Sequence, residues 1–211
     1  MIFEGRIVWL FREPRSGGTC LSNHLAAKLN RVYGWVDPRQ VVELFQQPMD
    51  EHKLLNTHRF GILQSMKNYD NPILMRCYRK NIAEQFLSMV FIGGHQDPVY
   101  NITNDQERNQ FDANLQRSMN SKRMIKKEHL DSFVVMKTKF NKLWNDISVD
   151  YESYDVCYED LVTGIDLFGL GQIDMQDYTQ KLPEDYKSKA FLNYNEIKQW
   201  ASMHNNDTGL I

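Results

Sequence analysis

The chain has 211 residues, 42% of them hydrophobic, and this is enough to bury the core of a single domain over 1–211. Its net charge of −2 gives no overall basic surface, so the composition argues against a nucleic-acid partner. No apolar run approaches the ~20 residues of a membrane span, and the amino terminus carries no charged leader before an apolar segment, so we expect a cytoplasmic protein without a membrane span.

The three cysteines, Cys20, Cys77 and Cys157, are odd in number and widely separated along the chain. Two of them lie within apolar runs that are typical of strands. This pattern does not suit a disulfide framework, so we predict buried thiols in a reducing compartment.

The amino-terminal segment 5–29 is predicted to form a strand, a glycine turn and a helix. The apolar run 7–11 is rich in β-branched and aromatic residues, and the hydrophobic residues of 20–29 recur at helical spacing. The turn between them, 14–19, reads Pro-Arg-Ser-Gly-Gly-Thr. The first amides of the helix would face the space above the strand's carboxyl end, where the glycines let a ligand approach the backbone. We therefore predict an anion site there, most naturally for phosphate.

Segment 31–50 contains two prolines among mixed residues, and we expect it to form a wall of the site rather than a strand of the sheet. Within it, residues 39–46 are expected to form a short helix. Another short helix is expected at 61–67.

Apolar runs predict three more strands, at 53–58, 73–79 and 153–158. A helix is expected after the second of them, at 81–90, where hydrophobic residues share one face and Asn81 can cap the first turn. Because strands alternate with helices, we predict an α/β fold with a parallel sheet that binds its ligand at the carboxyl edge.

Segment 93–120 is polar and short of periodic hydrophobic residues, so we expect a loop or lid there, or a partly disordered segment. The next segment, 121–145, has an apolar stripe at helical spacing and is predicted to form one long helix. Its lysines, Lys137 among them, mostly lie off the stripe and are expected on a solvated face. The spacing over 186–203 predicts a final helix that packs on the sheet.

The glycine turn is not a Walker A loop, which would need a lysine after its second glycine. Its cation, Arg15, comes before the glycines instead. The run at 14–19 resembles the 5′-phosphosulfate loop of sulfotransferases that use 3′-phosphoadenosine 5′-phosphosulfate (PAPS). This resemblance implies that the donor's phosphosulfate contacts five residues, Arg15, Ser16, Gly17, Gly18 and Thr19.

A second anion motif consists of Arg79 at a strand end and Ser88 nine positions later. A guanidinium can bind phosphate through two parallel hydrogen bonds, and the hydroxyl would lie about two turns into the following helix. The spacing resembles the 3′-phosphate motif of sulfotransferases, and the run 79–88 is much like that of the bacterial branch that sulfates carbohydrates. In the animal cytosolic branch the gap is one residue shorter, so Lys80 is the alternative to Arg79.

The pair Thr57-His58 closes a predicted strand, 21 positions before Arg79. Animal cytosolic sulfotransferases carry a similar Thr-His pair, and the resemblance implies that His58 is the general base that deprotonates the acceptor. A histidine titrates near neutrality and can accept that proton. Other branches use a glutamate, for which Glu43 and Glu13 are the candidates here.

Tyr158-Glu159-Asp160 resembles a tripeptide that follows a strand in many members of the family, where the tyrosine helps to hold the adenine. A tyrosine offers both a ring and a hydroxyl for this purpose. The alternative interpretation is a core tyrosine at a strand end, with Glu159 capping a helix.

These four matches occur in the family's order. The resemblance implies a three-layer sandwich with a mostly parallel central sheet, P-loop NTPase-like, that transfers a sulfuryl group from PAPS as co-substrate and needs no metal. His58 would deprotonate a hydroxyl or amine of a small-molecule or carbohydrate acceptor, while Arg15 stabilises the leaving phosphate.

The sequence also departs from the family pattern. Gly18 stands where animal enzymes often have a threonine, and Cys20 stands where they have an aromatic residue near the adenine. No clear Arg-Lys-Gly motif occurs near the carboxyl end, where Lys187 or Lys189 would have to substitute.

Two other classes remain open. A P-loop-like nucleotide kinase or hydrolase would need a carboxylate for Mg²⁺ and a lysine for the β- and γ-phosphates. A non-catalytic nucleotide-binding module of the same fold would bind the nucleotide without transferring sulfate, and the departures at Gly18 and Cys20 would fit it.

Overall fold

The structure is a computed structural model that describes residues 3–35, 53–57, 71–93, 105–173 and 185–204. Contacts within the chain divide it into two compact units. We call Met1–Lys80 with Lys139–Tyr178 the sheet unit, and Asn81–Thr138 with Thr179–Ile211 the helical unit. That residues 1–211 form one domain stays a prediction.

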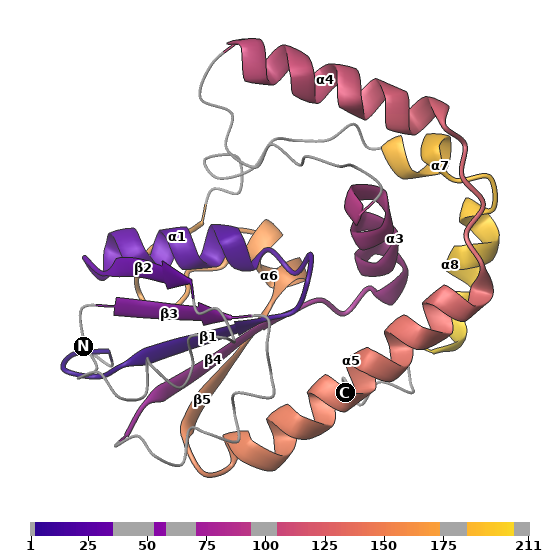
Figure 1. The fold of residues 1–211 in the computed structure, drawn as a ribbon. Coiled ribbons are helices and arrows are strands. Elements are labelled where there is room, and N and C mark those ends of the chain that lie inside the picture. The colour runs from indigo at the N-terminus through magenta and orange to yellow at the C-terminus, as the bar shows by residue number, and fades with distance from the viewer. Residues whose placement is uncertain (1–2, 36–52, 58–70, 94–104, 174–184, 205–211) are drawn as a thin grey trace. The chain divides into compact units, whose positions relative to one another are not determined.

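Five parallel strands form the sheet, in the order β2-β3-β1-β4-β5 (Figure 1). They are β1 (Val8–Arg12), β2 (Val32–Trp35), β3 (Lys53–Thr57), β4 (Ile73–Tyr78) and β5 (Glu152–Cys157). The mixed α/β class with a parallel sheet is therefore confirmed. The central strand β1 pairs with β3 on one side and β4 on the other.

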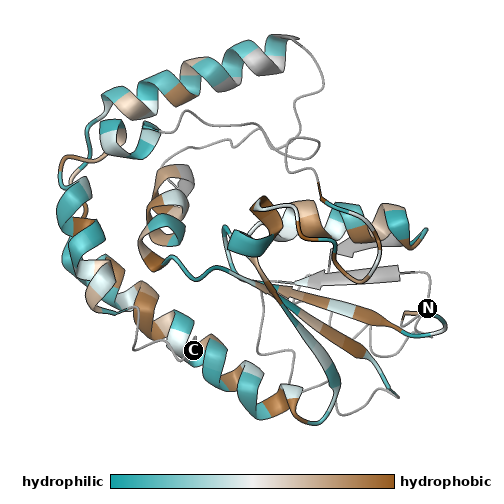
Figure 2. Cartoon of the chain, turned by 180° about the vertical axis from the view of Figure 1, so that it is seen from behind, coloured by the Kyte–Doolittle hydropathy of each residue, from teal (hydrophilic) through white to brown (hydrophobic). Residues whose placement is uncertain are grey.

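The two faces of the sheet are covered by different helices. Val8 and Leu10 belong to the same buried cluster as Leu21 and Leu25 of α1 (Gly18–Lys28). On the opposite face, the ring centre of Phe11 lies 6.1 Å from that of Trp144 in the carboxyl half of α5 (Lys127–Ser148). Successive residues of a strand point to opposite faces, so β1 is buried on both. Figure 2 shows β1 as hydrophobic along most of its length, as this position requires.

A buried arginine on the α5 face of the sheet is paired with a carboxylate at the surface. Arg76 of β4 is 4% exposed, and its Nε lies 2.8 Å from Oδ1 of Asp155 on β5. Its Nη1 donates to Oδ1 of Asn141 at 3.0 Å, and its guanidinium carbon lies 5.4 Å from the ring centre of Trp144. A buried charge is tolerated when it is paired and hydrogen-bonded in this way.

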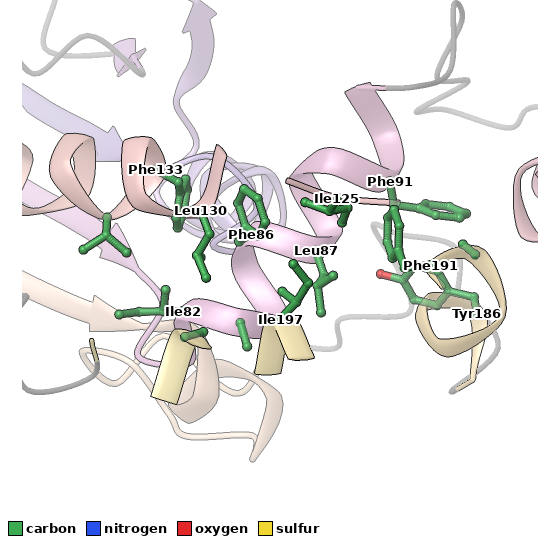
Figure 3. Close-up of a cluster of buried hydrophobic side chains, with 14 of the residues drawn as sticks. Ile82, Phe86, Leu87, Phe91, Ile125, Leu130, Phe133, Tyr186, Phe191 and Ile197 are labelled. Carbon is green, nitrogen blue, oxygen red and sulfur yellow. The ribbon is translucent and has the colours of Figure 1, made fainter. Parts of the chain in front are cut away.

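The helical unit contains α3 (Ile82–Gly93), α4 (Asp105–Asn120), α7 (Tyr186–Ala190), α8 (Tyr194–Met203) and the first half of α5. Its core is a cluster of buried side chains that includes Phe86, Leu87 and Ile197 (Figure 3). At the start of α3, the Glu84 amide donates to Oδ1 of Asn81 at 3.0 Å. The predicted Asn81 cap is therefore confirmed.

Several sequence predictions are wrong in the helical unit. Asp105–Asn120 is a helix, not part of a loop or lid, because Leu115 and Met119, one turn apart, are buried in the core. The long helix predicted over 121–145 begins only at α5, after Lys122 takes a left-handed backbone with φ of 43°. Lys137, expected on a solvated face, is 1% exposed and donates to Oε1 of Gln85 at 2.9 Å.

The predicted helix over 186–203 is also interrupted. It consists of α7 and α8, separated at Phe191, which forms a parallel bridge with Arg123. Beside this bridge the amide side chain of Asn193 accepts from the Ile125 amide and donates to the Ile125 carbonyl. These contacts join segments about seventy residues apart, so no local pattern reveals the break.

In the sheet unit, β2 lies within 31–50, where no strand was expected. The strand begins two residues after Asn30, whose left-handed φ of 50° turns the chain beyond the end of α1. The predicted helices at 39–46 and 61–67 lie outside the described residues. The three cysteines, all among the described residues, form no disulfide and are buried, as predicted. Among the described residues, the helices all lack the length or the apolar character that crossing a membrane requires.

Candidate anion-binding site

The glycine turn between β1 and α1 has a fixed local structure. Gly17 is the N-cap of α1 and is left-handed, with φ of 77°, and its carbonyl accepts from the Leu21 amide at 3.1 Å. Arg15 is also left-handed, with φ of 62°. This conformation costs a non-glycine residue roughly 1–2 kcal/mol, so the rest of the turn must hold it in place.

Ser16 helps to stabilise the conformation of the turn. Its amide and its hydroxyl both donate to the carbonyl of Glu13, at 3.3 and 2.7 Å, and the residue is 1% exposed. Ser16 therefore shapes the turn in this structure. A direct contact between its hydroxyl and a phosphosulfate stays a prediction.

Arg12, the last residue of β1, is a component of the site that the sequence reasoning missed. It is 8% exposed, and its Nη1 donates to Oγ1 of the exposed Thr19 at 2.9 Å. A Cβ added to Gly18 would lie 2.6 Å from Cβ of Arg12 and 2.5 Å from its Cδ. The glycine at position 18, a departure from the family pattern, is thus required by the arginine that packs beneath it.

Hydrogen bonds tie the turn to the carboxyl end of β4. The Glu13 amide donates to the Cys77 carbonyl at 3.0 Å, and the Cys77 thiol donates to the Ser16 carbonyl at 2.9 Å. Burial raises the pKa of Cys77 to about 12, so at neutral pH the sulfur keeps the proton that it donates. The turn is therefore anchored two residues before Arg79. Cys20 lies in the same buried cluster as Cys77, with residues of α1 and β1.

Arg79 and Tyr158, predicted from separate motifs, lie together at the ends of β4 and β5. The guanidinium carbon of Arg79 is 4.2 Å from the centre of the Tyr158 ring, and its Nε is 3.6 Å from Oε1 of Glu159. The other carboxylate oxygen of Glu159 accepts from the Lys80 amide and from the Cys157 thiol, each at 3.0 Å. Glu159 thus positions Arg79 over the tyrosine ring.

The electrostatics of this edge favour an anion. Arg12 is the last residue of β1, and Arg15 and Arg79 follow the ends of β1 and β4. Glu13 and Glu159 are the acidic residues near them. The first turn of α1, described in full, holds no acidic residue to compete at the positive end of the helix dipole. Backbone amides at such an end, together with guanidinium groups, can bind phosphate or sulfate oxygens.

The predicted general base and its alternatives are only partly placed. Thr57 ends β3, pairs in register with Phe11 and is fully buried, whereas His58 and Glu43 lie outside the described residues. Glu13, the other candidate, directly precedes the glycine turn, with 2% of its surface exposed.

Ser88 lies on α3 in the helical unit and is 5% exposed, so its pairing with Arg79 stays a prediction. The two lysines considered as substitutes for the missing motif take part in ion pairs. Lys187 pairs with Glu84, and Lys189 pairs with Asp185 at 2.6 Å.

Within the part of the chain that the structure describes, no three histidine, cysteine, aspartate or glutamate side chains gather as metal ligands would. Comparison with family models, with curated protein sequences and with solved structures finds no match.

Proposed function

We propose that the chain is a sulfotransferase that moves a sulfuryl group from PAPS to a hydroxyl or amine of a small-molecule or carbohydrate acceptor. The observation that supports this most is the contact between Arg79 and Tyr158 at the sheet edge to which Cys77 also ties the glycine turn. Residues chosen from three separate motifs for one nucleotide therefore follow neighbouring strands β1, β4 and β5. A three-layer, P-loop NTPase-like fold belongs to the same proposal, supported by α1 and α5 on opposite faces of the sheet.

In this proposal the glycine turn holds the phosphosulfate through the amides at the start of α1, Thr19 and Arg15. Arg79, with Ser88, holds the 3′-phosphate, and Tyr158 helps to hold the adenine. Contact with the guanidinium also fixes the orientation of the tyrosine ring.

The transfer step forms one bond to sulfur and breaks another. His58, the residue after the buried Thr57, takes the proton of the acceptor, and the acceptor's oxygen or nitrogen attacks sulfur in line. The bond between sulfur and the bridging oxygen breaks, and its electron pair stays on the 5′-phosphate of the departing adenosine 3′,5′-bisphosphate. Arg15 neutralises that growing charge, which is where electrostatic stabilisation lowers a barrier most.

Titration calorimetry with three nucleotides tests the proposal. We expect adenosine 3′,5′-bisphosphate to bind at least tenfold more tightly than adenosine 5′-phosphate or ATP, a difference of about 1.4 kcal/mol. Arg79→Ala should abolish this preference, whereas Arg117→Ala, which removes an exposed arginine of α4, should leave it unchanged. Tighter, magnesium-dependent binding and turnover of ATP would instead favour a kinase or hydrolase.

Turnover separates an enzyme from a binding module. Arg15→Ala should depress sulfate transfer far more than it weakens binding of the bisphosphate product, because the charge it neutralises grows only as the bond breaks. Equal losses in both would contradict the role of Arg15. Binding of the bisphosphate without sulfate transfer to any hydroxyl or amine acceptor would identify a non-catalytic module.

A further inference from the structure

We propose that Arg12 is a positioning residue: it fixes the Thr19 hydroxyl so that this group donates its proton to an oxygen of the anion bound at the glycine turn. The identity of that anion, the phosphosulfate of PAPS, rests on the proposed function.

Packing against Gly18 fixes the path of the Arg12 side chain. Its side chain runs beneath Gly18, where a Cβ would come within 2.6 Å of the Cβ of Arg12, and it ends 2.9 Å from Oγ1 of Thr19. Arg12 is 8% exposed, so the guanidinium reaches the hydroxyl from inside the protein. Thr19 itself is exposed and is the second residue of α1, among the helix amides that have no partner one turn earlier in the helix.

The chemistry of the bond sets its direction. A guanidinium has only donors, so in its bond with Arg12 the Thr19 oxygen must be the acceptor. The hydroxyl proton of Thr19 is then left to donate to another group, and a bound anion supplies acceptors. The adjacent positive charge also strengthens the hydroxyl as a donor.

Ser22, one turn further along α1, shows the usual alternative. Its hydroxyl donates to the Gly18 carbonyl within the helix, so its proton is already used. The residue four positions before Thr19 is Arg15, which lies in the turn before the helix begins. The Arg12 bond occupies one acceptor site of the Thr19 oxygen and leaves its proton for a group outside the helix.

A double-mutant cycle tests the coupling. Arg12→Met and Thr19→Val should each weaken binding of adenosine 3′,5′-bisphosphate and of inorganic pyrophosphate about tenfold, the scale of one hydrogen bond to a charged group. Because both act through one hydroxyl, the double variant should bind no more weakly than the weaker single variant. Ser22→Ala should change neither affinity by more than about twofold.

If the affinity loss of the double variant equals the product of the two single losses, the inference is overturned. An unchanged affinity in Arg12→Met would overturn it as well. If Arg12→Met does not fold, Arg12→Lys is measured with the opposite expectation. A lysine keeps a charge and a donor at this position, so Arg12→Lys should keep most of the affinity, and adding Thr19→Val to it should still cause the tenfold loss. If the unaltered chain binds pyrophosphate but not the bisphosphate, the proposed function fails while the cycle with pyrophosphate still tests Arg12. If it binds neither probe, the inference fails as well.

Discussion

Replacing Gly18 by alanine should disturb the glycine turn through a single steric overlap. The new Cβ would lie 2.6 Å from Cβ of Arg12, and ordinary contact begins at 3.4 Å, so the helix start and the strand would have to separate by about 0.8 Å. The Cβ of Arg12 is fixed to the backbone of the central strand. It cannot yield as the end of a flexible side chain would.

Such overpacking typically costs 1–3 kcal/mol, and alanine's preference for helix over glycine returns up to ~1 kcal/mol. We therefore expect Gly18→Ala to lower the free energy of unfolding by about 1–2 kcal/mol. Because the shift also separates Arg12 from Thr19, binding of adenosine 3′,5′-bisphosphate should weaken about tenfold.

Urea unfolding followed by tryptophan fluorescence is a suitable assay, because Trp9 and Trp144 are buried in the sheet unit. Gly169→Ala is the matched control: at φ of +71°, with nothing within 4 Å of the new Cβ, it measures a backbone cost alone, of about 1 kcal/mol. Its affinity for the bisphosphate should not change.

Adding Arg12→Ala to Gly18→Ala should restore only part of the stability. It removes the contact at 2.5 Å with Cδ but leaves the one at 2.6 Å with Cβ. If Gly18→Ala matches the unaltered chain in stability and affinity, the packing of Arg12 beneath Gly18 is wrong.

Three further predictions concern single side chains. Asp155→Asn removes the carboxylate that faces buried Arg76, and urea unfolding should report a loss of about 1–2 kcal/mol. Glu159→Gln removes a negative charge beside Arg79 but keeps an oxygen that can accept from the guanidinium and hold its position. Calorimetry at low salt should therefore find the bisphosphate bound a few-fold more tightly, and weaker binding would contradict an anion at Arg79. Burial, before any other cause, holds the pKa of His24 below the ordinary 6.5. The folded chain thus resists protonation that the unfolded chain accepts, and stability present above pH 6.5 should fall as the pH drops below it. His24→Gln should flatten that part of the profile.

The elements predicted best are those with dense local patterns. The continuous apolar run of β1 and the helical spacing of α1 each predicted an element within about two residues of its bounds. β2 is four residues long and contains Gly34, so it has no such run. The helix α4 has too few apolar residues to show a period, and its burial depends on contacts with α7, far along the chain.

In the candidate site, too, the features set by local sequence could be predicted and those set by long-range contacts could not. The glycine turn could be predicted because its left-handed residue at 17 and the helix start are local. The contact between Arg79 and Tyr158 depends on β4 and β5 being neighbours, which the order of motifs suggests but does not specify. Arg12 was missed because a charged residue at a strand end usually faces water. The one sequence signal for burial was its position two residues after Leu10, which places both side chains on the same face of the strand.

The thiol of Cys77 gives this protein a built-in reporter of the turn's motion. The sulfur is buried and donates a hydrogen bond to the Ser16 carbonyl. A thiol-reactive reagent can therefore reach it only when the turn opens. The rate of its alkylation therefore measures how often the glycine turn opens, and a ligand that keeps the turn closed should slow that reaction as its occupancy rises.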